Sequence, residues 1–153
     1  MRLTSYTDYA LRTLLYLAMH REQLVTIQEI ADLHGIAKNH LTKVVHQLGQ
    51  IGLVETVRGR NGGLKLGREP ADINIGEVIR QTETDFYMAE CFDRENRSCA
   101  HSSSCNLKDV LVAATAAYMQ VIDGVTLENL VKKNTGRGTI KPLRFVAPTK
   151  KKK

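Results

Sequence analysis

The segment TIQEIADLHGIAKNHLTKVVHQLGQIGLVE constrains the fold more than any other part of this 153-residue chain. Thr26 and Glu29 have the spacing of a capping box, which predicts that a helix begins beside them. Gly35 can adopt the left-handed backbone that ends a helix, and apolar spacing predicts a second helix from about Lys38 to Gln50. With small Ala31 one turn before Gly35, the two helices can cross closely over a tight turn. The segment therefore predicts a helix-turn-helix.

The flanking segments complete a winged helix-turn-helix over residues 1–70. LTSYTDYALRTLLYLAMH opens with the capping residue Thr4 and carries apolar residues at helical spacing on a wide face, which predicts a buried helix. Downstream, LVETVRGRNGGLKL predicts two short strands, Leu53 to Val57 and Leu64 to Leu66, joined by a hairpin turn at Asn61-Gly62. The predicted fold is mainly α with a small β-wing, followed by a long dimerisation helix.

Basic and amide side chains gather on the second helix and the wing. Between residues 34 and 68 there are six lysines and arginines, with only Glu55 to oppose them. Such an excess favours a polyanion partner. We expect contacts with double-stranded operator DNA from Lys38, Asn39, His40, Thr42, Lys43, His46 and Gln47 on the helix and from Arg58, Arg60, Asn61, Gly62, Gly63 and Lys65 at the wing. The alternative is a small helical domain whose solvated face is basic.

Residues 71–131 are predicted to contain a linker helix from Ile75 to about Thr82, a loop with clustered cysteines and a long helix that stops near Gly124. The long helix carries a row of apolar residues at the spacing of packed helices, namely Leu107, Leu111, Ala114, Tyr118 and Val121. This seam predicts a homodimer. The alternative is that the seam covers the N-terminal core of its own chain.

No segment predicts a membrane span. The apolar stretch from Tyr9 to Met19 is too short to cross a bilayer and is interrupted by Arg12. We therefore expect a cytoplasmic protein, in which thiols stay reduced. Residues 132–153 are basic and show little periodicity, so they are expected to form a disordered tail.

All three cysteines lie in the polar stretch CFDRENRSCAHSSSC, with the spacing C-x7-C-x5-C. Three thiols cannot all pair within one chain, and there is no C-x-x-C redox motif, which argues against a thiol enzyme and for a non-enzymatic role. Three thiolates on one loop can instead converge on a metal centre. The residues alone leave three alternatives open, which are zinc with His101 as the fourth ligand, an iron–sulfur cluster and free thiols.

The motifs LTSYTDYALR, KNHLTKVVHQLGQIGLV and RGRNGGLKLG, with three clustered cysteines before a long helix, resemble those of the NsrR group of nitric-oxide-sensing repressors. That group belongs to a winged-helix family that also includes the iron–sulfur regulator IscR. The resemblance covers about residues 1–131 and implies a homodimer with one iron–sulfur cluster per subunit. Three thiolates with one labile ligand leave one iron distinct, which favours 4Fe-4S, with 2Fe-2S as a form that arises when it decays. The implied ligands are Cys91, Cys99, Cys105 and, from the partner subunit, Asp8.

The same resemblance implies a repressor that binds operator DNA and releases it when nitric oxide attacks the cluster. Two features depart from the family pattern. The first two cysteines are further apart than usual, and Leu107 stands where IscR-type proteins have a ligating histidine. Asp8 also has a second interpretation, as a first-turn carboxylate that favours the helix dipole. Alternative functions are an IscR-like sensor of cluster supply or redox state and a zinc-stabilised DNA-binding protein.

Overall fold

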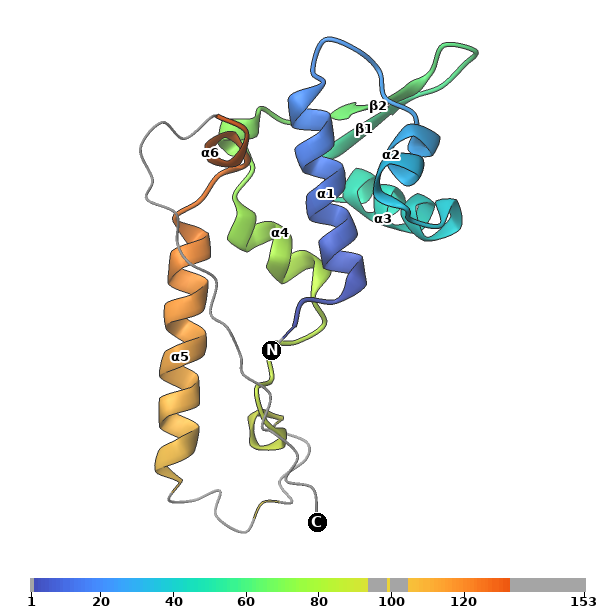
Figure 1. The fold of residues 1–153 in the computed structure, drawn as a ribbon. Helices are drawn as coiled ribbons and strands as arrows, with labels where there is room; N and C mark the ends of the chain where they lie inside the picture. The colour runs from blue at the N-terminus through green and yellow to red at the C-terminus, as the bar shows by residue number, and fades with distance from the viewer. Residues whose placement is uncertain (1, 94–98, 100–104, 133–153) are drawn as a thin grey trace, which may run out of the picture.

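The computed structural model describes residues 2–93, 99 and 105–132, which form a mainly helical chain with a small antiparallel wing (Figure 1). Its helices and strands are α1 (Ser5–Met19), α2 (Ile27–His34), α3 (Lys38–Gln50), β1 (Val54–Val57), β2 (Gly63–Leu66), α4 (Ile75–Thr82), α5 (Asn106–Asp123) and α6 (Leu127–Val131). Two short 3-10 turns, η1 (Pro70–Asp72) and η2 (Glu90–Phe92), flank α4. The predicted fold class is confirmed. The predicted tail from residue 133 onward lies outside the described residues.

Side-chain caps mark the beginnings of α1, α2 and α4. Thr4 caps α1 and Asn74 caps α4, each by accepting a hydrogen bond from a backbone N–H in the first turn. Thr26 and Glu29 form both hydrogen bonds of the predicted capping box at α2. These bonds satisfy amides that the first turn of a helix leaves without a partner. The helix starts therefore follow from the local sequence.

One hydrophobic core joins the helix-turn-helix to the segment that follows the wing. Helix α1 lies at its centre and packs against α3, α4 and α6 (Figure 1). The buried residues Ala10 and Leu14 of α1 belong to the same cluster as Leu41 and Leu48 of α3 and Leu127 of α6. Burying a leucine contributes roughly 1.5–3 kcal/mol to stability, so the burial of Leu127 helps to hold α6 against α1. The two predicted regions share one core.

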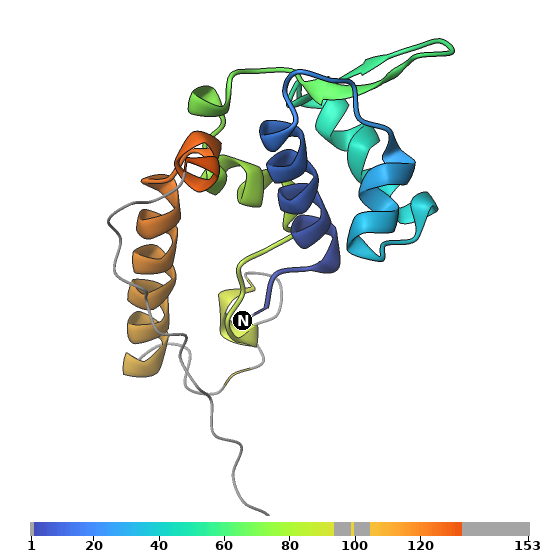
Figure 2. The same ribbon diagram turned by 45° about the horizontal axis from the view of Figure 1, so that its top comes forward.

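The wing is a two-stranded antiparallel hairpin that projects beyond α2 and α3 (Figure 2). The prediction was wrong by one residue at each strand start. β1 begins at Val54 rather than Leu53, and β2 begins at Gly63 rather than Leu64. The backbone N–H of Leu53 donates to the carbonyl oxygen of Leu48 at 2.9 Å. This bond joins the start of the wing to the end of α3. It uses the N–H of Leu53, so β1 begins one residue later, at Val54.

The hairpin predicted from Asn61-Gly62 is present, and its turn spans residues 59–62. Val57 pairs with Gly63, so residues 58–62 form the tip. The left-handed residue is Gly59, at φ 121°, and the Gly62 N–H donates to the Gly59 carbonyl oxygen at 3.0 Å. A Cβ on Gly62 would collide with the carbonyl oxygen of Val57. The strand register thus leaves residues 58–62 as the tip, and both glycines are needed to reverse the chain there.

Helix α5 stands beside α4, on the side away from α2 and α3 (Figures 1 and 2). Its C-terminal end is held by Asp123, whose carbonyl oxygen accepts from Asn74 Nδ2 at 2.7 Å and whose carboxylate pairs with Arg80 at 2.5 Å. No residue of α5 is buried. One chain therefore anchors the end of α5 and leaves much of its surface open. Neither α5 nor any other described helix is long and apolar enough to cross a membrane.

Candidate nucleic-acid interface and cysteine site

A tight turn joins α2 to α3. Gly35 ends α2 with a left-handed backbone at φ 63°, and Ile36 after it is buried. Ala37, at the N-cap of α3, makes no side-chain hydrogen bond. The first turn of α3 therefore has no side-chain acceptor at its positive end, which is an arrangement that attracts anions.

The outward face of α3 carries polar and basic side chains, while its other face packs into the core. Leu41, Val44 and Leu48 are buried. Exposed positions hold Lys38, Asn39, His40, Thr42, Lys43 and His46. The two lysines form no ion pair with any residue that the structure describes. Their ammonium groups are therefore free of ion pairs within the described residues, and their role as DNA contacts stays a prediction.

Gln47 is placed differently from the other predicted residues of α3. Its Oε1 accepts a hydrogen bond from the hydroxyl of Tyr6 at 2.6 Å, and its Nε2 donates to the carbonyl oxygen of Gln81 at 2.9 Å. The Tyr6 hydroxyl also lies 3.2 Å from the carbonyl oxygen of Lys43. The amide of Gln47 thus joins α3 to α1 and α4. Its role as a DNA contact stays a prediction.

The wing places its arginines at the tip. Arg58, Arg60 and Asn61 are exposed, whereas Gly62 and Gly63 are half-buried. Within the described part of the chain neither arginine has an ion-pair partner.

Lys65, the remaining predicted wing residue, lies on β2 and contacts Glu55 on β1, with 3.1 Å between Nζ and the carboxylate. An exposed pair of this kind contributes only about 0–1 kcal/mol. The lysine can therefore exchange Glu55 for a phosphate at little cost.

The three cysteines are free thiols. Cys91 lies in η2, Cys105 occupies the N-cap of α5, and Cys99 is an exposed residue between them. Among the described residues, no group of three or more histidine, cysteine, aspartate or glutamate residues is arranged to hold a metal ion. His101, the alternative zinc ligand, lies outside the described residues. The thiols are thus available as ligands, and their convergence stays a prediction.

Asp8 lies in the first turn of α1, where a carboxylate is favoured by the helix dipole. Its Oδ2 is 2.9 Å from Arg12 Nη2, and the side chains of Arg12 and Asp8 are 44% and 43% exposed. A pair this exposed is weak. The carboxylate is therefore near the surface, with one partner that it can leave, and its role as a metal ligand stays a prediction.

The exposed apolar face of α5 is rotated from the predicted seam. Leu111 and Tyr118 are half-buried and so face their own chain. The exposed row keeps the alternating spacing of packed helices and consists of Leu107, Val110, Ala114, Ala117 and Val121. Leu107, Val110 and Val121 are 64%, 63% and 72% exposed, so this row does not cover the chain's own core.

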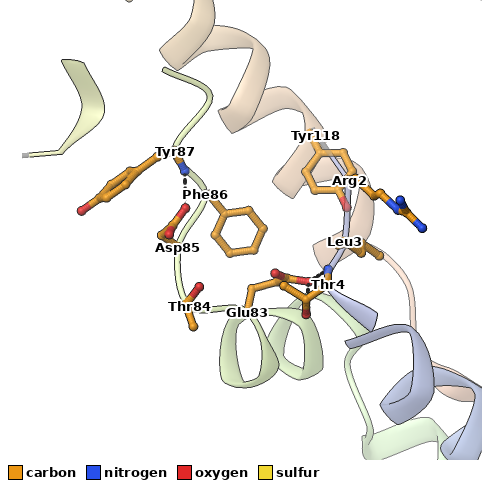
Figure 3. A pocket seen from close by; sticks show the side chains of 9 residues that line it. All are labelled: Arg2, Leu3, Thr4, Glu83, Thr84, Asp85, Phe86, Tyr87 and Tyr118. Carbon is orange, nitrogen blue, oxygen red and sulfur yellow. Dashed lines mark hydrogen bonds between the residues drawn. The ribbon is translucent and has the colours of Figure 1, made fainter. Parts of the chain in front are cut away.

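A pocket of about 230 Å³ lies where the start of α1, the end of α4 and α5 meet (Figure 3). At its edge Glu83 Oε1 accepts hydrogen bonds from the backbone N–H of Thr4 at 2.8 Å and from the Thr4 hydroxyl at 3.2 Å. Tyr118 lines the pocket from α5 (Figure 3). Burial raises the pKa of its phenol, and the nearby Glu83 carboxylate raises this pKa further. The junction therefore links the N-cap of α1 to the segment that leads to Cys91.

The sequence reasoning missed Tyr6 and Glu83 as residues that connect the helices. Tyr6 and Gln47 are 41 positions apart in the chain, and Thr4 and Glu83 are 79 positions apart. No periodicity within a helix relates such pairs. The available signal was a tyrosine in the first turn of a helix, because a partly buried tyrosine hydroxyl usually finds a hydrogen-bond partner.

Comparison with known proteins agrees with this architecture. The model of the Rrf2 family, described as iron-dependent transcriptional regulators, matches residues 3–133. The HTH-type transcriptional regulator NsrR of Bacillus subtilis is 54% identical over 133 residues, covering 86% of this chain and 91% of the relative. NsrR of Shouchella clausii is 52% identical over 132 residues, covering 86% and 89%. Among solved structures, IscR of T. potens matches with a TM-score of 0.70 at 26% identity, covering 90% of this chain and 94% of that one.

These matches span the helix-turn-helix, the wing, the cysteine segment and α5. The resemblance to NsrR inferred from the sequence is confirmed, as is a regulatory role that is not enzymatic. The chain therefore belongs to the Rrf2 family of iron-dependent transcriptional regulators.

Proposed function

We propose that two copies of the chain form a repressor that holds one iron–sulfur cluster per subunit and releases operator DNA when nitric oxide reacts with the cluster. The observation that carries this proposal is the combination of three free thiols, Cys91, Cys99 and Cys105, with 52–54% identity to NsrR proteins. By the resemblance described above, NsrR-type repressors use such cysteines to bind the cluster through which they sense nitric oxide.

The donor set of the chain fits an iron–sulfur cluster. Soft thiolates are the ligands that these clusters prefer, and none of the three thiols is used in a disulfide. Cys105 makes no capping hydrogen bond at the start of α5, so its Sγ is free to ligate at the positive end of the helix dipole, where an anionic group is favoured. When bound, the cluster supplies iron atoms that nitric oxide binds avidly.

Asp8 of the partner subunit is the proposed fourth ligand. A carboxylate would be a harder and weaker ligand for this centre than a thiolate, so Asp8 would be the most labile member of the ligand set. Its alternative partner is already in place, because Arg12 lies one turn further along α1, 2.9 Å from the carboxylate. Asp8 can therefore change between a ligand that joins two subunits and an ion pair within one subunit.

DNA binding is proposed to use residues 1–70 of each subunit. The exposed face of α3 enters the major groove, where Asn39 and His40 can reach base edges and Lys43 can reach phosphates. The wing brings Arg60 to the neighbouring backbone. Because residues 71–131 set the distance between two such modules, a change at the cysteine segment alters half-site spacing, to which paired helix-turn-helix proteins are sensitive.

The deciding experiment compares operator binding by anaerobically purified holo protein and by apo protein, each with and without nitric oxide. We expect a brown holo protein that binds tightly and is released by nitric oxide, and an apo protein that binds weakly. The proposal fails if the apo protein binds as tightly and nitric oxide releases it equally well. A colourless protein that contains stoichiometric zinc would instead support the zinc-stabilised alternative.

The ligand assignment is tested by replacing each cysteine separately. Cys91→Ser, Cys99→Ser and Cys105→Ser should each lower iron and sulfide content and operator affinity together, since all three thiolates are needed. The exposed residue Gln23 provides a control, because Gln23→Ala changes a surface side chain in the loop between α1 and α2, outside the cysteine segment and the turn that carries Asp8. A cysteine variant that retains full iron content would remove that residue from the ligand set.

A further inference from the structure

Both polar atoms of the Gln47 side chain form hydrogen bonds within the chain. Oε1 accepts from Tyr6 Oη at 2.6 Å, and Nε2 donates to the Gln81 carbonyl oxygen at 2.9 Å. A glutamine that reads adenine in the major groove uses the same oxygen and nitrogen in a bidentate contact. Gln47 would therefore have to break two internal hydrogen bonds before it could read a base.

These hydrogen bonds lie beside an open groove at the surface. The groove, of about 400 Å³, is lined by Tyr6, Gln47 and Gln81, together with residues at the start of α1 and the end of α4. The two hydrogen bonds join α3 to α1 and to α4 at this groove.

We propose that Gln47 is a positioning residue which, together with Tyr6, holds the recognition helix α3 against α1 and α4 and transmits the state of the cysteine segment to α3. This inference rests on the proposed function, in which that segment carries the sensing centre. We call the hydrogen-bonded set of Tyr6, Gln47 and Gln81 the α3 latch.

The α3 latch is connected to the cysteine segment through the first turn of α1 and through Glu83. Tyr6 lies in the same first turn of α1 as Asp8, and the N-cap of that turn, Thr4, donates twice to Glu83. Glu83 begins the segment that runs along the pocket of Figure 3 toward Cys91. A displacement of this segment or of Asp8 therefore moves the turn that carries Tyr6. Because the Tyr6 hydroxyl is hydrogen-bonded to Gln47 of α3, this displacement changes the angle at which α3 meets DNA.

The test compares Tyr6→Phe, Gln47→Ala and the double variant with wild-type protein. For each, operator affinity is measured in the holo and apo states, and base preference is measured by substituting single base pairs of the operator. We expect each single variant to lower the ratio of holo to apo affinity at least about fivefold, with base preference unchanged. The double variant should lower it no further, because both changes break one unit. Tyr9→Phe is the matched control and should leave the ratio unchanged.

A readout that does not depend on the cluster comes from unfolding of the apo proteins. Tyr6→Phe and Gln47→Ala should be non-additive in midpoint denaturant concentration if the hydrogen bond is present, whereas Tyr9→Phe and Gln47→Ala should be additive. The inference is overturned if Gln47→Ala relaxes preference at one base pair while Tyr6→Phe does not, or if the two changes are additive. If wild-type holo and apo proteins bind equally, the proposed function fails. The positioning role is then judged by base preference and unfolding alone.

Discussion

Replacing two valines on the exposed row of α5 with lysine should separate the proposed dimer. Val110 and Val121 are 63% and 72% exposed in one chain. Full burial of a valine contributes roughly 1.5 kcal/mol, so about 1 kcal/mol per residue remains to be gained at an interface. Two valines from each subunit then contribute about 4 kcal/mol, which corresponds to roughly a thousandfold change in the dimer dissociation constant. The added lysines also bring like charges together across the interface.

The assay is sedimentation velocity over a range of protein concentrations, with operator affinity measured in parallel. Val110→Lys combined with Val121→Lys should sediment as a monomer at micromolar concentration and lose operator affinity. Val112→Lys is the matched control, because Val112 is 47% exposed on the same helix but points away from the row. Unchanged dimerisation of the double variant would refute the reasoning. A monomeric Val112→Lys variant would place the interface on the opposite face of α5.

Three further predictions concern charge. Arg60→Ala and Lys43→Ala should each weaken operator binding at all base pairs and reduce the slope of log affinity against log salt by about one, as expected for one lost phosphate contact; unchanged slopes would contradict the assignment. Asp8→Ala should still assemble iron on three thiolates but change its rate of reaction with nitric oxide, measured by absorbance; an unaltered rate would remove Asp8 from the site. The hydrogen bonds from Arg21 lower the pKa of Glu69 below its ordinary value of 4.5, so the pair stabilises the fold above that value and loses its effect as the pH falls through the lower pKa. Glu69→Gln should therefore lower the thermal midpoint at pH 7, and by progressively less as the pH falls below 4.5; an equal loss at every pH would contradict a charge effect.

Local chemistry made most of the helix boundaries predictable. Thr4 and the capping box of Thr26 and Glu29 act within one helical turn, so the residues that start α1 and α2 can be recognised without knowing the rest of the structure. The basic face of α3 was predictable for the same reason, because a helical period separates buried Leu41 and Val44 from their exposed neighbours. The three cysteines identified a candidate metal centre by chemistry alone.

Tertiary packing decided the features that depend on distant partners. Helix α5 carries apolar residues on several of its faces, so spacing allowed more than one seam. Only the folded chain shows that Leu111 and Tyr118 are half-buried, with Tyr118 beside the segment before Cys91. Gln47 looked like a base reader on a helical wheel. It became a contact between three helices because folding brought Tyr6 and Gln81 to its two polar atoms. Residue type and local spacing therefore determined the helices and the kinds of chemistry available, whereas long-range contacts determined which face of each helix was left free to act, since side-chain partners far apart in sequence meet only in the folded chain.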